Sequence, residues 1–243
     1  MLDVLHLPLY TCGMDLDTSM RSFSFVNLGL IGYSECLLIQ QQLVKRRLEG
    51  SIGDILLLLE HQPVITMGTA GGENSLLVAP ELIKQAGIEI RKTDRGGNVT
   101  YHGPGQLVGY PIFDLRSHGK DVHTFLRNLE RVIVGVLSDF GVTGKTLPGY
   151  TGVWVNEDKI CSIGIAVRRW ISYHGFALNV DPILDHWQFI HPCGLVGKQV
   201  TSLKQILGYS PSMDAVKASV VDGIAKVFGM DAVALDADSI TSV

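Results

Sequence analysis

Apolar residues recur at helical spacing in several stretches of this chain. The clearest is 121–140, where they repeat with the 3.6-residue period of a helix and Gly141 follows as a C-cap. Pro80 and Ser212 stand at positions that are favoured where helices begin. The same reasoning predicts further helices over 34–48, 80–86, 202–207 and 212–228.

Runs rich in β-branched and apolar residues lie between these helices. They predict strands over 54–60, 63–67, 88–92, 107–113, 153–155, 159–167 and 172–180. Helices and strands are mixed rather than strictly alternating, and the closely spaced strands after residue 150 are typical of a hairpin. We therefore expect one α/β domain of the α+β type over residues 24–243, with a central mixed sheet flanked by helices. We expect residues 1–23 to be a poorly ordered N-terminal extension.

Two of these strands place small side chains on one face. Alternation puts Ser162 and Gly164 on the same side of the strand over 159–167, and Gly175 and Ala177 on one side of the next strand. Small residues on neighbouring strands leave a shallow trough for a ligand, or they accommodate bulky side chains from a packed helix. The pattern alone leaves both interpretations open.

Composition narrows the class of protein. With 46% hydrophobic and 18% charged residues, the 243-residue chain is long and apolar enough to bury a proper core. Its net charge of -4 argues against a nucleic-acid-binding domain. The longest apolar runs are too short for a membrane span, and the N-terminus lacks the basic region of a signal peptide. Because the cysteines show no metal-ligand spacing, we expect a cytoplasmic, reduced protein without a metal or another cofactor.

The glycine-rich stretch RGGNVTYHGPGQ, residues 95–106, is the most unusual local sequence. So many glycines indicate left-handed backbone angles or a close approach to the backbone. A phosphate-binding loop would end in Gly-Lys-Ser/Thr, and a dinucleotide loop would need a small residue in place of Val108 and a helix after it. Another strand-like run follows instead, so the stretch is not typical of a nucleotide site.

Cys193 is a candidate nucleophile, because the segment HPCG has neither helical nor strand periodicity and is easier to approach than Cys161 within a strand. A thiol is only a few per cent thiolate at pH 7, so a catalytic one needs a cation or a base beside it. Spacing does not choose among the candidate partners, which are Lys159, His102, His174 and His191.

Four motifs in a fixed order resemble those of the octanoyltransferases of lipoate biosynthesis, the lipoyl(octanoyl) transferase family. The similarity extends over most of the chain, and the motifs are RGGNVTYHGPGQ (95–106), KICSIG (159–164), HGFALNV (174–180) and PCG (192–194). The resemblance implies a fold like that of biotin and lipoate protein ligases. It also implies transfer of an octanoyl group from octanoyl-acyl carrier protein to a lysine of lipoyl domains, in E2 subunits of 2-oxoacid dehydrogenases and in the glycine cleavage H protein.

On this resemblance, Cys193 is the nucleophile that carries the acyl thioester and Lys159 is its partner, whose ammonium would favour the thiolate. The acyl-substrate contacts that the resemblance implies are Arg95, Gly96, Gly97, Asn98, Val99, Thr100, Tyr101, His102, Ser162, Ile163, Gly164, Gly175, Phe176 and Ala177. These include the small residues of the two strands, so alternation and resemblance indicate the same place.

Other functions stay open at this point. An ATP-dependent lipoate or octanoate ligase, or a lipoyl-domain amidotransferase, would have the same fold, and a non-catalytic carrier-binding protein would keep the fold without the thiol chemistry. An acidic carrier would need a local basic patch. The candidate clusters are Lys45 with Arg46 and Arg47, Arg127 with Arg131, and Arg168 with Arg169.

Overall fold

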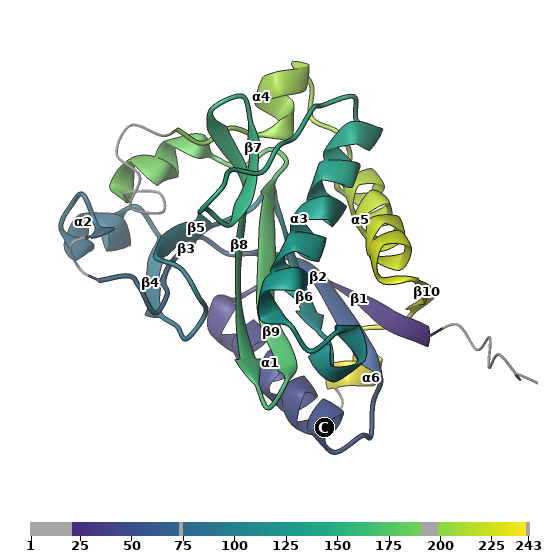
Figure 1. Ribbon diagram of the computed structural model, residues 1–243. Helices are drawn as coiled ribbons and strands as arrows, with labels where there is room; N and C mark the ends of the chain where they lie inside the picture. Colours follow the sequence, from purple (N-terminus) through teal and green to yellow (C-terminus); the bar gives the residue numbers. More distant parts are fainter. Residues whose placement is uncertain (1–20, 73–74, 191–198, 242–243) are drawn as a thin grey trace, which may run out of the picture.

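A large mixed sheet with a small sheet beside it forms the framework of the protein (Figure 1). The structure, a computed structural model, describes residues 21–72, 75–190 and 199–241. Within them, the seven strands of the large sheet run in the order β10 (Met230–Ala234), β1 (Arg21–Ile31), β2 (Asp54–His61), β6 (Gln106–Ile112), β9 (Ile171–Asn179), β8 (Asp158–Arg168) and β7 (Gly152–Val155). The small sheet has the order β4 (Glu89–Lys92), β3 (Val64–Met67) and β5 (Val99–His102).

Both parallel and antiparallel pairs occur in the large sheet. Strands β10, β1 and β2 pair in parallel, and β2, β6, β9, β8 and β7 continue antiparallel. Strand β7 covers only the first part of β8, where Gly152 lies opposite Ser162. The rest of β8 is therefore free to contact the segment that precedes β5.

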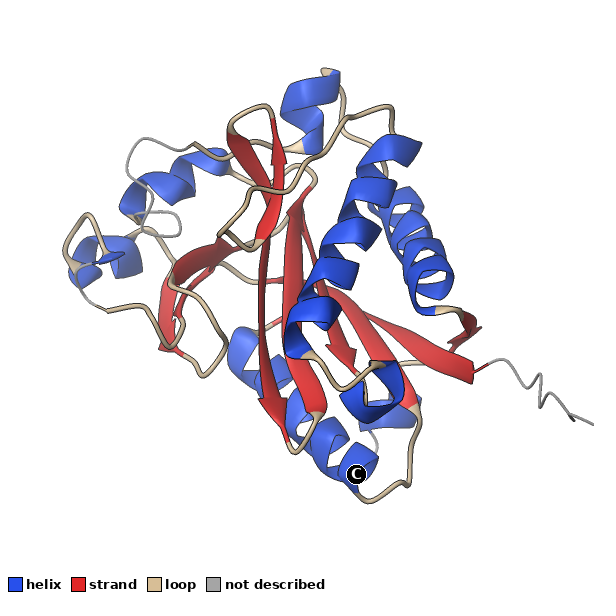
Figure 2. Ribbon diagram, in the orientation of Figure 1, coloured by secondary structure: helices blue, strands red, loops and turns tan. Residues whose placement is uncertain are grey.

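Helices cover both faces of the large sheet (Figure 2). On one face, α3 (Val122–Asp139) and α5 (Met213–Phe228) bury a continuous apolar cluster, and α1 (Tyr33–Leu48) with α6 (Asp238–Thr241) buries another on the opposite face. Helix α3 begins after Asp121, whose carboxylate accepts from the backbone N–H of His123. The small sheet packs with α2 (Pro80–Gln85) and the 3₁₀ helix η3 (Leu184–Phe189); η2 (Leu115–His118) and α4 (Leu203–Leu207) are further short helices.

The predicted mixed sheet and the flanking helices are confirmed, and each predicted helix or strand lies within two residues of an observed one. Strands β1, β5 and β10 and the short helices η2, η3 and α6 were not predicted. Strand β1 lacks a regular alternation, since Phe23 and Val26 are buried while most of its other side chains are partly or fully exposed. It starts at Arg21, inside the range 1–23 assigned to the extension, because Phe23 packs into the core; the folded part therefore begins before residue 24.

No helix within the described residues combines the length and the apolar character that crossing a membrane requires.

Candidate active site

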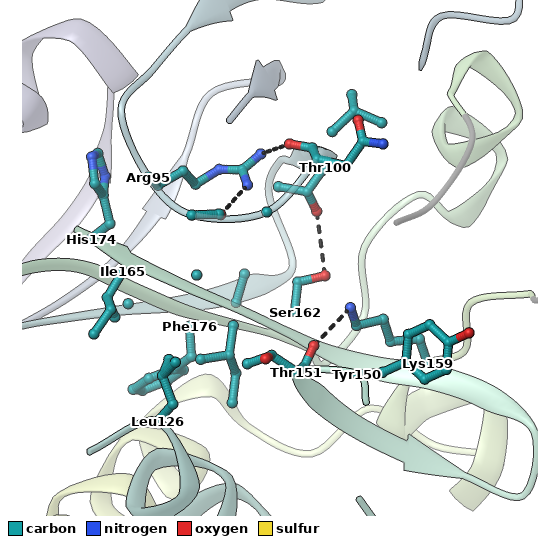
Figure 3. Close-up of a pocket in the computed structure, with 18 of the residues that line it drawn as sticks. Arg95, Thr100, Leu126, Tyr150, Thr151, Lys159, Ser162, Ile165, His174 and Phe176 are labelled. Atoms are coloured by element: carbon teal, nitrogen blue, oxygen red, sulfur yellow. Dashed lines mark hydrogen bonds between the residues drawn. The ribbon is translucent and has the colours of Figure 1, made fainter. Parts of the chain in front are cut away.

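A cavity of about 410 Å³ lies among the glycine-rich segment, strands β8 and β9 and the first turns of α3 (Figure 3). Every predicted substrate contact except Tyr101 lines it, and Lys159 does so as well. Its volume is in the range of pockets that hold small molecules. The two strands and the glycine-rich segment, which are far apart in the sequence, are thus brought together as expected.

Arg95 organises the glycine-rich segment from within. Its side chain is 8% exposed, and its guanidinium donates to the Thr66 carbonyl at 2.6 Å, to the Asn98 carbonyl at 3.0 Å and to the Gly96 carbonyl at 3.1 Å. Gly97 takes a φ of +89°, which suits glycine best. The fork of N–H groups therefore fixes the backbone carbonyls of a tight turn that forms one wall of the cavity.

Strand β5 explains why Tyr101 is the exception. Its side chains alternate, so Thr100 and His102 face the cavity while Tyr101 points into the small-sheet core. There the Tyr101 ring stacks edge-on against Trp187 at 4.9 Å and its hydroxyl bonds to His186 at 2.7 Å. Tyr101, predicted as a substrate contact, is thus a core residue. Recognising residues 99–102 as a strand would have separated it from its neighbours.

The small residues of β8 and β9 meet main chain rather than helix side chains. A Cβ added to Gly164 would lie 2.6 Å from the Gly96 carbonyl oxygen, and one at Gly175 would lie 2.1 Å from the carbonyl oxygen of Gly109. The Gly96 N–H also donates to the Ile165 carbonyl at 2.9 Å. The predicted trough is therefore occupied at its two glycines by neighbouring backbone, and the cavity extends beside them.

Lys159 is held at the beginning of β8, where its side chain is 6% exposed. Its Nζ donates to the Thr151 carbonyl oxygen at 3.3 Å and lies 5.1 Å from the centre of the Trp154 ring (Figure 3). Its backbone N–H donates to the Gln199 carbonyl at 2.9 Å, and the Thr201 N–H donates back to the Lys159 carbonyl. The ammonium thus faces the cavity from a fixed strand.

The histidines near the other end of the cavity are kept neutral by burial. Desolvation lowers the pKa of His102 well below its usual value and also lowers the pKa of His174, despite the opposing effect of Asp94. His102 donates from Nδ1 to Gln106 at 2.8 Å, and His174 donates from Nε2 to Asp94 at 2.9 Å. The Nδ1 atom of His174 is buried without a hydrogen-bond partner. Neither histidine contacts Lys159 in the structure.

His61 extends this neutral group behind the cavity. Its Nδ1 donates to the Ile31 carbonyl at 3.0 Å, so its Nε2 accepts from the Tyr110 hydroxyl at 2.8 Å. Burial lowers the pKa of His61 to about 4. Tyr110 and Tyr33 line the cavity next to these rings, and sequence reasoning missed both. Tyr33 follows a Gly at a helix start, a position that carries no recognisable ligand signal.

Cys193 and His191 lie outside the described residues. The two described cysteines are buried, and desolvation raises the pKa of both Cys36 and Cys161 to about 12. Such thiols are unreactive at neutral pH. The expected position of Cys161 within a strand is confirmed. The described residues hold no group of three or more His, Cys, Asp and Glu side chains suited to a metal ion.

Of the basic clusters, the one on α3 is linked to the Lys159 region, because Arg127 donates to Glu130 and Glu130 accepts from the N–H of Gly152, next to the Thr151 carbonyl that Lys159 contacts. Arg168 and Arg169 lie with Lys45 around a separate surface hollow at the far end of β8. Nine residues of strand separate Lys159 from Arg168, which corresponds to about 30 Å. Arg47 is engaged with Asp54 at 2.9 Å.

Comparisons with known proteins agree with this arrangement. Residues 32–225 match the family described as the lipoyl protein ligase A/B catalytic domain. A curated octanoyltransferase from Caldicellulosiruptor bescii is 47% identical over 83% of this chain and 90% of its own length, and one from Solibacter usitatus is 46% identical over 87% and 96%.

Solved structures share the fold at low identity. Lipoate-protein ligase A bound with ATP has a TM-score of 0.73 at 16% identity, covering 91% of this chain and 92% of its own. A bi-partite lipoate protein ligase from Thermoplasma acidophilum has a TM-score of 0.71 at 18% identity, covering 90% of each chain. These likenesses confirm the lipoate-ligase-like fold. The curated relatives, which are octanoyltransferases, show which family with this fold the chain resembles in sequence. The chain belongs to the lipoyl(octanoyl) transferase family.

Proposed function

We propose that this protein transfers an octanoyl group from octanoyl-acyl carrier protein to the lysine of lipoyl domains, through a thioester on Cys193. The lipoyl domains would be those of E2 subunits and of the H protein. The observation that carries the proposal is a cavity with apolar walls and one fixed ammonium, that of Lys159, in a chain whose curated relatives are octanoyltransferases. We also expect the protein in the cytoplasm, which cell fractionation would test.

The position of Lys159 supports its role beside the thiol. Gln199, six positions after Cys193 in the sequence, accepts a hydrogen bond from the Lys159 backbone. This backbone hydrogen bond thus connects the strand that bears Lys159 to the part of the chain that follows Cys193 in the sequence. A cation close to a thiol favours the thiolate, which is the attacking form.

The chemistry proceeds in two balanced steps. The Cys193 thiolate attacks the carbonyl carbon of the octanoyl thioester, the new C–S bond forms, and the carrier sulfur leaves and takes up a proton. The amine of the lipoyl-domain lysine then attacks the acyl-cysteine, forms the amide bond, releases the Cys193 thiolate and loses a proton. In this proposal Lys159 donates the first proton and accepts the second.

The cavity walls suit the acyl chain. Leu126, Ile163, Phe176 and Ala177 present carbon atoms, and Thr100 and Ser162 close one side through a 3.4 Å hydrogen bond between their hydroxyls. Burial of each methylene group stabilises the complex by about 0.8 kcal/mol. The apolar walls therefore favour an eight-carbon chain inside the cavity over one in water, both when the carrier delivers it and while the thioester lasts.

The proposal also includes docking of the carrier protein on the α3 cluster of Arg127 and Arg131, because of where this cluster lies. The acyl thioester has to reach the Lys159 end of the cavity, and this cluster lies on the helix whose Leu126 lines that cavity. The Arg168 and Arg169 cluster lies about 30 Å along β8 and is too remote to guide the thioester directly.

The test is a transfer assay with two acyl donors. Octanoyl-carrier protein and an unmodified lipoyl domain are incubated with the enzyme, and the mass of the lipoyl domain is followed; octanoate with ATP replaces the carrier in a parallel reaction. We expect the octanoyl mass increase only with the carrier. Modification with octanoate and ATP alone would support a ligase instead, and full biological function of Cys193→Ala would support a non-catalytic carrier-binding protein.

A further inference from the structure

Glu130 is the most deeply buried carboxylate near the cavity, and the reaction described above does not use it. It lies on α3 one turn after Leu126, its side chain is 0% exposed, and the helix brings it to the start of β7. A buried carboxylate is costly unless both of its oxygens are paired. The hydrogen-bond partners of Glu130 therefore indicate its role.

The partners of Glu130 lie on two sides. Its Oε2 accepts from Arg127, three residues earlier on the same helix, and its Oε1 accepts from the backbone N–H of Gly152 at 3.0 Å. The N–H of Gly152 and the carbonyl of Thr151 belong to one peptide group. That same Thr151 carbonyl oxygen accepts from the Lys159 ammonium at 3.3 Å (Figure 3).

One peptide group thus connects the carboxylate to the ammonium. The planar peptide transmits orientation, because fixing its N–H fixes the direction of its carbonyl. A negative charge on the N–H side also polarises the peptide and strengthens the carbonyl as an acceptor. Glu130 therefore acts on Lys159 without touching it.

Gly152 is adapted to this arrangement. Its φ of +139° is one that other residues rarely adopt. A Cβ at this position would lie 2.7 Å from Cε of Lys159 and 2.6 Å from the Cys161 carbonyl oxygen. The lysine side chain runs directly over the peptide that Glu130 holds.

We propose that Glu130 is a positioning residue for the transfer reaction: through the Thr151–Gly152 peptide it fixes the ammonium of Lys159 in the cavity. The inference rests on the proposed function, since it concerns the group that serves the Cys193 thiol. It predicts that losing the acceptor at position 130 lowers the rate of the chemical step more than it weakens carrier binding.

Two variants at position 130 test the proposal. Glu130→Met keeps the length of the side chain and removes the acceptor, and we expect single-turnover release of the carrier thiol to slow by about tenfold to a hundredfold, with the carrier KM changed by less than about twofold. Glu130→Gln keeps an oxygen for the Gly152 N–H and should retain most of the rate. In a Lys159→Met background, Glu130→Met should cause no further loss.

The split between the single-turnover rate and KM separates this role from simple support of the fold. Glu130→Gln keeps the length of the side chain and an acceptor oxygen, so it should release the carrier thiol faster than Glu130→Met by about tenfold while the two KM values stay alike. Asp139→Ala, which removes the bond from α3 to Ser219 at the other end of the helix, serves as a control and should leave both the rate and KM unchanged.

The proposal is overturned if Glu130→Met turns over like the wild type, or if it loses the same factor in the Lys159→Met background. Should Glu130→Met fail to fold, a folded Glu130→Gln variant that releases the carrier thiol as slowly as Lys159→Met overturns it. A wild type that releases no carrier thiol would instead contradict the proposed function, and this inference with it.

Discussion

The ionisable side chains are charged at one end of the cavity and neutral at the other. At one end, Lys159 presents an ammonium against a backbone carbonyl and an aromatic face. At the other, His102 and His174 are buried and lose their charge to desolvation. Ile165 of β8 pairs with His174 and is six residues from Lys159, so the two ends are about 20 Å apart (Figure 3).

This difference suits the two ends to different tasks in the proposed reaction: the Lys159 end to the chemical step, and the histidine end to binding of the acyl chain. A thioester reaction needs charge where electrons move, whereas an alkyl chain is best accepted by a wall without net charge. The neutral histidines satisfy their ring nitrogens largely within the protein, so they shape the wall without attracting ions. Among the described residues of the cavity, Lys159 is the one to which the proposed mechanism gives proton transfer.

Removing the charged end should have the largest effect. On the proposed mechanism, Lys159→Ala deletes the cation that would favour the thiolate and the group that would transfer protons, so we expect kcat to fall by about 10²- to 10⁴-fold. Single-turnover release of the carrier thiol measures this directly. Loss of less than about tenfold would show that another group supports the reaction.

Protonating the neutral end should destabilise the fold. His61 has a folded pKa of about 4 against 6.5 in the unfolded chain, so the unfolded state binds more protons between these values. The stability that neutral burial provides is complete above pH 6.5 and is lost as the pH falls towards 4, by about 3 kcal/mol for this residue. Urea unfolding at pH 7 and pH 4.5 measures the change.

His61→Gln provides the control for this prediction. The variant should be less stable at pH 7 but should depend less on pH between 6.5 and 4, because one of the titrating groups is gone. An equally steep dependence in the variant would contradict the assignment of His61. Asp94 and Asp114, whose pKa values are lowered, contribute mainly below this window.

A smaller effect is expected from adding a methyl group at Gly164, which packs on the glycine-rich segment between the two ends of the cavity. Gly164→Ala would place a Cβ 2.6 Å from the Gly96 carbonyl oxygen and push the glycine-rich segment away from β8, at a cost of about 1–3 kcal/mol in unfolding free energy and with a raised carrier KM. Gly135→Ala in α3 is the matched control, since nothing lies within 4 Å of its added Cβ. It should stabilise the helix by up to about 1 kcal/mol.

The smallest effect concerns the surface near the charged end. Charge reversal at Arg131, which unlike Arg127 is not paired with Glu130, should raise the carrier KM by about threefold to tenfold and weaken its dependence on salt, because exposed charges act mainly on encounter. The same reversal at Arg168 and Arg169, at the far end of β8, is the matched control and should change KM little. Equal effects at both clusters would contradict docking on α3.

The sequence predicted the framework well because its long elements are strongly patterned. Helix α3 was predicted over 121–140 and runs from Val122 to Asp139, since apolar positions at a 3.6-residue period face one core. Strand β5 was missed because it is only four residues long and lies within the glycine-rich stretch, and strand β10 because four of its five side chains are exposed. Short or exposed strands gain their stability from partners that are remote in the sequence.

The sequence predicted the side chains that line the cavity better than the contacts made by backbone groups. The glycine-rich stretch was expected to admit an acyl chain, and it does line the cavity, but its Gly96 carbonyl is itself the group that packs on Gly164. The peptide between Thr151 and Gly152 carries no side-chain signal, so its contacts with Glu130 and Lys159 could not be anticipated. Contacts made by backbone groups depend on the three-dimensional arrangement alone.

The most direct test of the acyl-enzyme mechanism is the mass of the intact protein after mixing with octanoyl-carrier protein in the absence of a lipoyl domain. The account predicts one added octanoyl group, located on Cys193 by peptide mapping, which disappears when a lipoyl domain is added and appears on that domain instead. Consumption of the carrier thioester with no adduct on Cys193, or with the octanoyl group on another residue, would contradict it.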